Sequence, residues 1–204
     1  MILSNSCPAV LLVALMSLDL VVRVASFGPP LPILTEYPVS GNPLRIAVES
    51  PSRVWFTLPA ENSIGRLQVD SDGQSQVTYY PVTTPLSEPY DLEYVGGQVW
   101  FSERAGNKIG RLDVTTGVIS EFEIQTPNSQ PTGVDVVAGD PVTIWFAERE
   151  GDQLARLEVN TTLDSSLTEY PLPVQYVDAD LEDVFFDAGK GIWFTAPGVS
   201  KFGI

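Results

Sequence analysis

Carboxylates are the side chains of this sequence with the greatest capacity for chemistry. The 204 residues contain 26 Asp and Glu against 11 Lys and Arg, with no His and one Cys. Asp178, Asp180 and Glu182 alternate along the chain, so an extended backbone would turn all three carboxylates to one side. Oxygen ligands of this kind suit Mg²⁺ or Ca²⁺, and Glu182, with acidic neighbours, is the candidate general base. The alternative interpretation is a solvated acidic loop that holds no metal.

The composition excludes several classes of function. Without His, triads that use a His base and His-ligated zinc sites are excluded, and one Cys excludes an internal disulfide. The net charge of −15 argues against nucleic acid and anionic membrane surfaces as partners, because phosphate binding needs clustered Lys and Arg. Apolar residues make up 44% of the chain and charged residues 18%, which predicts a folded chain with a sizeable core.

Residues 1–26 differ from the rest of the chain. The continuous apolar run from Ala9 to Met16 has the length of the apolar region of a secretory signal peptide. It is short for a membrane span, which needs about 20 apolar residues. We therefore expect export to the extracellular or periplasmic space, with no membrane span in the mature chain. No basic residue precedes the run, and a chain without a signal peptide would be cytoplasmic. Residues 27–32 then form a Pro-rich linker.

A repeat organises the chain from residue 33 onward. Each copy contains a Trp-Phe pair, and the pairs lie 45, 45 and 48 residues apart. A second signature, such as Gly110-Arg111-Leu112, follows at constant spacing, and a Pro opens three of the copies. Features in constant order at this period are typical of repeat architectures. The pairs are Trp55-Phe56, Trp100-Phe101, Trp145-Phe146 and Trp193-Phe194, within repeats 43–82, 89–127, 131–173 and 180–204.

Each repeat has the pattern of four short strands separated by turns. Units of four strands and about 40–50 residues are typical of β-propeller blades. Adjacent strand residues point to opposite faces, so both rings of a Trp-Phe pair are buried only if a blade has neighbours on both faces. The sequence therefore predicts an all-β protein, a β-propeller of about four four-stranded antiparallel blades.

The last repeat stops within its third strand. Residues 33–38 match residues 166–171, an outer strand, at five of six positions. We therefore expect residues 33–38 to join the last blade and close the ring, which removes exposed strand edges and favours a monomer. An open arc or a dimer is the alternative.

The stretch from Trp100 to Asp113, Trp-Phe-Ser-Glu-Arg-Ala-Gly-Asn-Lys-Ile-Gly-Arg-Leu-Asp, resembles the virginiamycin B lyase (streptogramin lyase) family, as do residues 33–204 as a whole. Members of that family look like seven-bladed propellers, so three blades are missing here relative to the enzymes. Active members open a macrocyclic lactone antibiotic by elimination, using Mg²⁺ and a His base that follows the Pro opening a blade. The aligned positions in this sequence hold no His; they are Leu44, Tyr90, Thr132 and Glu182.

Strand direction predicts where a ligand site would lie. The loops after the opening Pro and the residues after each Trp-Phe pair should share one face near the axis. The candidate ligand-binding residues on this face are Tyr90, Asp91, Thr132, Glu103 and Glu148.

Three functional hypotheses remain. The favoured one, because the His is absent, is a non-catalytic binding or scaffold module that uses an acidic axial face for a small-molecule or protein ligand. The second is a diverged Mg²⁺-dependent carbon–oxygen lyase that opens a streptogramin B lactone. The third is a partial propeller that functions only in an assembly. Mg²⁺ or Ca²⁺ is the only cofactor that the residues suggest.

Overall fold

The structure, a computed structural model, describes residues 10–14, 21–25 and 35–204. A hairpin of β1 (Val10–Ala14) and β2 (Val21–Ala25) stands apart from the repeats. The rest of the expected leader and linker lies outside the described residues. Among the described residues, no helix has the length and apolar character needed to cross a membrane.

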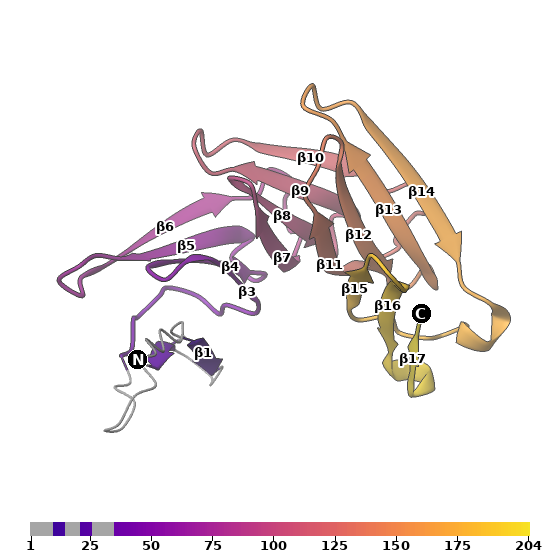
Figure 1. The fold of residues 1–204 in the computed structure, drawn as a ribbon, viewed down its shortest axis with the longest axis horizontal. Helices are drawn as coiled ribbons and strands as arrows, with labels where there is room; N and C mark the ends of the chain where they lie inside the picture. The colour runs from indigo at the N-terminus through magenta and orange to yellow at the C-terminus, as the bar shows by residue number, and fades with distance from the viewer. Residues whose placement is uncertain (1–9, 15–20, 26–34) are drawn as a thin grey trace, which may run out of the picture.

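Four antiparallel sheets follow the four repeats (Figure 1), and each begins with its innermost strand. The first sheet contains β3 (Ile46–Ser50), β4 (Arg53–Leu58), β5 (Ser63–Val69) and β6 (Ser75–Pro81). The second contains β7 (Pro89–Val95), β8 (Gln98–Glu103), β9 (Lys108–Asp113) and β10 (Ile119–Glu123). The third contains β11 (Pro131–Val137), β12 (Val142–Glu148), β13 (Gln153–Val159) and β14 (Ser165–Pro171).

The fourth sheet has three strands, β15 (Val184–Asp187), β16 (Gly191–Ala196) and β17 (Lys201–Gly203). Two short 3₁₀ turns, η1 (Val174–Tyr176) and η2 (Pro197–Val199), flank its strands. The prediction of an all-β, propeller-like fold built from antiparallel blades is confirmed.

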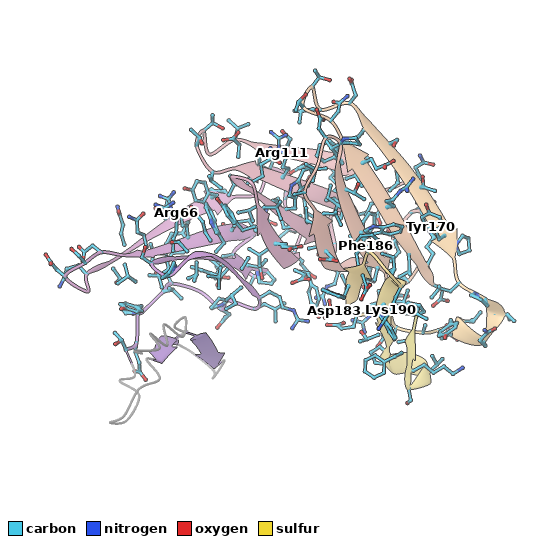
Figure 2. The ribbon with its side chains drawn as sticks, viewed as in Figure 1. Arg66, Arg111, Tyr170, Asp183, Phe186 and Lys190 are labelled. Carbon is cyan, nitrogen blue, oxygen red and sulfur yellow. The ribbon has the colours of Figure 1, made fainter. Side chains whose placement is uncertain are left out.

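Apolar side chains fill the spaces between neighbouring sheets (Figure 2). Trp55 packs toward the second sheet, where it shares a core with Phe101. Trp100 packs toward the third sheet, where it meets Phe146. Between neighbouring sheets, therefore, the Trp of one sheet faces the following sheet and the Phe of that sheet faces the preceding one. Burial of both rings between sheets was the reason for predicting stacked blades, and these four rings are buried.

A small residue opposite each Phe lets the ring lie flat on the sheet. Gly110 pairs with Phe101 across β8 and β9, and a Cβ on Gly110 would overlap that ring. Gly65 and Gly203 stand in the same relation to their own Phe rings. The third sheet differs, because Ala155 stands opposite Phe146 there.

The sheets form an open arc, with the first and fourth at its two ends (Figure 1). The predicted pairing of residues 33–38 with the last sheet is not formed. Residues 35–38 are not a strand, residues 33 and 34 lie outside the described range, and β17 pairs only with β16. Instead, Tyr37 and Val39 are buried on the first sheet, against Phe56. The short connection to β3 keeps this segment at the first sheet, at the far end of the arc from β17.

Candidate functional site

Side chains from all four repeats meet where the inner strands begin. The Tyr90 hydroxyl donates a hydrogen bond to Oε1 of Glu182, and Nη2 of Arg45 lies 2.8 Å from the same oxygen. Nη1 of Arg149 lies 4.0 Å from the other carboxylate oxygen, Oε2. Arg45 precedes β3, Tyr90 lies in β7, Arg149 follows β12 and Glu182 precedes β15. The site therefore depends on the arrangement of the whole arc.

Tyr90 lies between two guanidinium groups. The Arg104 guanidinium carbon is 4.7 Å from the centre of the Tyr90 ring, and that of Arg45 is 5.3 Å away. Nε and Nη2 of Arg104 also donate to Oε2 of Glu88, at 3.2 and 2.9 Å. Burial, followed by the hydrogen bond to Glu182, raises the pKa of Tyr90, so the phenol stays protonated and remains a donor at neutral pH.

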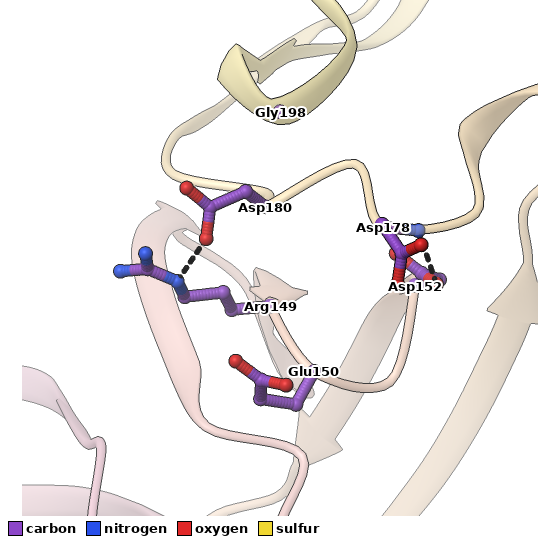
Figure 3. Close-up of a pocket in the computed structure, with 6 residues that line it drawn as sticks. All are labelled: Arg149, Glu150, Asp152, Asp178, Asp180 and Gly198. Atoms are coloured by element: carbon purple, nitrogen blue, oxygen red, sulfur yellow. Dashed lines mark hydrogen bonds and ion pairs between the residues drawn. The ribbon is translucent and has the colours of Figure 1, made fainter.

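Arg149 forms an ion pair with Asp180, the acidic residue that opens the fourth repeat (Figure 3). We call the whole set the axial cluster; it comprises Arg45, Glu88, Tyr90, Arg104, Arg149, Asp180 and Glu182. It holds three Arg and three carboxylates, so the expected acidic face is balanced in charge at this point. The three Arg were not predicted. The signal that points to two of them is the Glu-Arg dipeptide that follows Trp-Phe at 103–104 and 148–149.

Two predicted members of the face, Glu103 and Glu148, are fully buried. Oε2 of Glu148 accepts a hydrogen bond from Gln153 at 2.9 Å. Burial raises the pKa of each carboxyl to about 7. At Glu103 the Ser87 hydroxyl, followed by the Lys108 ammonium, partly offsets that rise. Both Glu side chains turn into the protein beneath the loops.

Two further members, Asp91 and Thr132, connect neighbouring sheets. Asp91 accepts a hydrogen bond from the Val134 backbone N–H at 3.0 Å, and burial raises its pKa to about 6. The buried Thr132 hydroxyl donates to the Leu181 carbonyl at 2.9 Å. Leu181 immediately precedes Glu182, so this hydrogen bond positions the residue that Tyr90 contacts. Of the predicted face residues, Tyr90 alone belongs to the axial cluster; Asp91 and Thr132 hold the sheets around it.

The predicted metal ligands are divided between two places. Asp178 and Asp180 have φ of 58° and 55°, so the backbone is not extended and the expected alternation is lost. Both line a cavity of about 340 Å³ that adjoins the axial cluster, because Asp180 and Arg149 belong to both, whereas Glu182 does not line the cavity. The cavity residues are Arg149, Glu150, Asp152, Asp178, Asp180 and Gly198 (Figure 3).

The cavity is not arranged as a cation site. Asp152 accepts hydrogen bonds from the backbone N–H groups of Asp178 and Ala179, both at 3.0 Å, and Asp180 is paired with Arg149. Within the described part of the chain, no group of three or more Asp, Glu, Cys or His side chains is placed to hold a metal ion. The residues present therefore do not fit the Mg²⁺ that the family resemblance implies.

Comparison with known proteins relates this arc to a family of enzymes. A sequence model of the virginiamycin B lyase family matches residues 32–203. The structure of virginiamycin B lyase from Staphylococcus aureus is 30% identical over 76% of this chain, with a TM-score of 0.61. A streptogramin B lyase structure is 29% identical over 90% of the chain, with a TM-score of 0.69. A search of curated protein sequences found no match.

The arc also resembles proteins with other functions. An auxiliary nutrient-binding protein from Bacteroides ovatus covers 93% of this chain and 57% of its own, at 12% identity and a TM-score of 0.57, which shows a shared fold alone. This chain spans 48% and 60% of the lengths of the two lyase chains. The match to the family covers nearly all of the repeats, and the chain belongs to the virginiamycin B lyase family.

Proposed function

We propose that this chain is a non-catalytic binding module, and that the axial cluster takes a small-molecule ligand. The observation that carries the proposal is the hydrogen bonding of the Glu182 carboxylate. This residue occupies one of the four positions that align with the catalytic His of the family, yet its carboxylate accepts hydrogen bonds from Tyr90 and Arg45. A general base needs a free lone pair directed at the substrate proton. Oε1 of Glu182 is already shared by two donors, and Oε2 lies 4.0 Å from Nη1 of Arg149.

The chemistry of the axial cluster favours a ligand rich in carbonyl or carboxylate oxygens. Arg guanidinium groups carry donors in a planar fork that matches such oxygens, and Arg45, Arg104 and Arg149 surround Tyr90 and Glu182. The Tyr90 ring offers a flat surface for stacking at the same place. A macrocyclic lactone of the streptogramin B type presents many carbonyl oxygens, so it is the probe that both the chemistry and the family support.

Calorimetric titration of a streptogramin B lactone into the purified chain tests the proposal. We expect saturable binding, and we expect Arg45→Ala to weaken it about 10- to 100-fold, as for loss of a hydrogen bond from a charged group. Arg53→Ala is the matched control, because Arg53 pairs with Glu49 on the first sheet and lies outside the axial cluster. No measurable heat with the wild-type chain, or equal weakening by both variants, would reject the axial cluster as a site for such a ligand.

A further inference from the structure

The fourth sheet exposes the face that the other sheets bury. Trp193 is 39% exposed, whereas Trp55 and Trp100 are 0% and 1% exposed beneath the following sheet. Phe185 and Phe202, at 60% and 77%, lie beside Trp193 and line a shallow cavity of about 170 Å³. Within the described chain, no sheet covers this Trp face. An uncovered apolar face of this kind marks an interaction surface.

The first sheet carries the complementary face. In the second sheet, the surface that receives Trp55 is built from Val99, Phe101 and Leu112. The strand pairings assign the same positions of the first sheet to Val54, Phe56 and Leu67, which form one cluster there. The first and second sheets therefore present the same three apolar positions on this surface. Among the described residues, no Trp covers the surface of the first sheet.

The segment that does cover the first sheet occupies the position of an outer strand. Tyr37 and Val39 lie on the receiving surface of the first sheet. Tyr80 and Val82, from the end of β6, lie in the same way on the receiving surface of the second sheet. Residues 35–39 thus stand where the outer strand of a preceding blade would stand, and no strand among the described residues pairs with them.

Among the described residues, the fourth sheet lacks the outer strand that the other three sheets have. In the first sheet, β5 lies between β4 and β6, whereas β17 pairs only with β16. Asn62 has φ of 51°, and its carbonyl accepts the N–H of Val82, which follows the outer strand. Ser200, seven residues after Trp193 as Asn62 is after Trp55, has φ of 55°. The backbone beside β17 is therefore already shaped to receive an outer strand.

We propose that a second copy of this chain packs its fourth sheet on the first sheet. Residues 35–38 of one copy then pair with β17 of the other, with Tyr37 opposite Phe202 as Tyr80 is opposite Ile64. Contacts at both ends of each arc give eight blades, within the usual range of about 4–8.

Sedimentation equilibrium of the full chain tests the contact. We expect a species of twice the 22.2 kDa monomer mass for the wild-type chain and a monomer for Phe202→Glu. Phe202 is largely exposed in the single chain, so its replacement leaves the fold intact. Val118→Glu is the control, because Val118 is also exposed, at 59%, but lies on the turn before β10. A wild-type monomer at every concentration tested overturns the proposal, as does dimer loss with the control.

Cross-linking tests the register. In a Cys7→Ser background, Thr35→Cys and Ile204→Cys are prepared as separate chains and mixed under oxidising conditions. The proposed pairing puts residues 35 and 204 opposite each other, within disulfide reach. We expect a covalent dimer only in the mixture, and at least tenfold less when Lys201→Cys replaces Ile204→Cys, because three residues along a strand move the thiol about 10 Å away. Equal cross-linking of both mixtures, or none, overturns the register.

Discussion

The second and third sheets have similar interiors but different axial ends. In both, an Arg follows the buried Glu at the end of the Trp-Phe strand, and its N–H bonds to the carbonyl of the residue that precedes the blade. In the second sheet that residue is Glu88, and Arg104 pairs with it. In the third sheet it is Gln130, and Arg149 reaches instead to Asp180, which precedes the fourth sheet.

The difference distinguishes the positions that maintain the fold from the positions that form the candidate site. Interior positions meet the same neighbours in every blade, so packing requires the same residues repeatedly. Axial positions meet a different partner in each blade, because they face the centre of the arc. A single exchange of Glu for Gln therefore redirects Arg149 across to the next repeat and brings it within 4.0 Å of Glu182. The irregular residues of a repeat protein are the first place to look for its function.

The largest expected effect concerns a feature that the two sheets share, the buried acids Glu103 and Glu148. A folded-state pKa of about 7, above the ordinary value of 4.5, means that the folded chain holds a proton that the unfolded chain releases. This contribution to stability is greatest below pH 4.5 and is lost as the pH rises to about 7. Glu103→Gln and Glu148→Gln should each raise the free energy of unfolding by up to about 3 kcal/mol over wild type at pH 8, and change it little at pH 4.

Urea unfolding at pH 4, 6 and 8 measures this gain. Glu150→Gln, an exposed neighbour, corrects for the loss of one negative charge from a chain of net charge −15. A gain of equal size at pH 4 and pH 8 would show that the two buried carboxyls do not titrate in this way.

A smaller effect is expected where the two interiors differ, at Gly110 and Ala155. Gly110→Ala places a methyl group against the Phe101 ring, which should destabilise the chain by about 1–3 kcal/mol, the usual effect of overpacking. The reverse exchange, Ala155→Gly, removes a methyl group that Phe146 already accommodates, and should cost about 1 kcal/mol. Thermal unfolding of both variants checks the comparison. An unchanged melting temperature for Gly110→Ala would mean that the second sheet can accommodate a methyl group where the structure shows no space for one.

The smallest effects belong to the axial ion pairs, whose side chains are partly exposed. Double-mutant cycles should give a coupling of about 0.2–1 kcal/mol for Arg104 with Glu88, and the same for Arg149 with Asp180. The crossed pair of Arg149 with Glu88 should show none. Coupling in the crossed pair would mean that the Arg side chains exchange partners, and the contrast between the two sheets would then be lost.

The repeat made most of the fold predictable from the sequence. Trp-Phe pairs at constant spacing identified the blades, because alternation along a strand leaves both rings buried only between stacked sheets. The likeness of residues 33–38 to an outer strand was real, since Tyr37 and Val39 occupy an outer-strand position, but its partner strand was assigned to the wrong place. Sequence similarity identifies the type of strand, while the curvature of the arc decides which edges meet.

The candidate site was harder to predict. Asp178 and Asp180 adopt positive φ, which a sequence pattern for extended backbone does not reveal. Glu103 and Glu148 follow a strand that ends near the axis, yet their side chains turn inward beneath the loops. Arg45 carries no repeat signal, and only the structure brings it to Glu182 from the other end of the arc.

The most direct test of the account is chromatography of a streptogramin B lactone incubated with the purified chain and Mg²⁺. Because elimination opens the ring without changing the mass, retention time must be followed as well as mass. If Glu182 is held by Arg45 and Tyr90 as part of a binding site, the lactone will bind and be recovered intact. A new peak of unchanged mass, growing with time and abolished by Glu182→Gln, would contradict the account and establish Glu182 as the base of a working lyase.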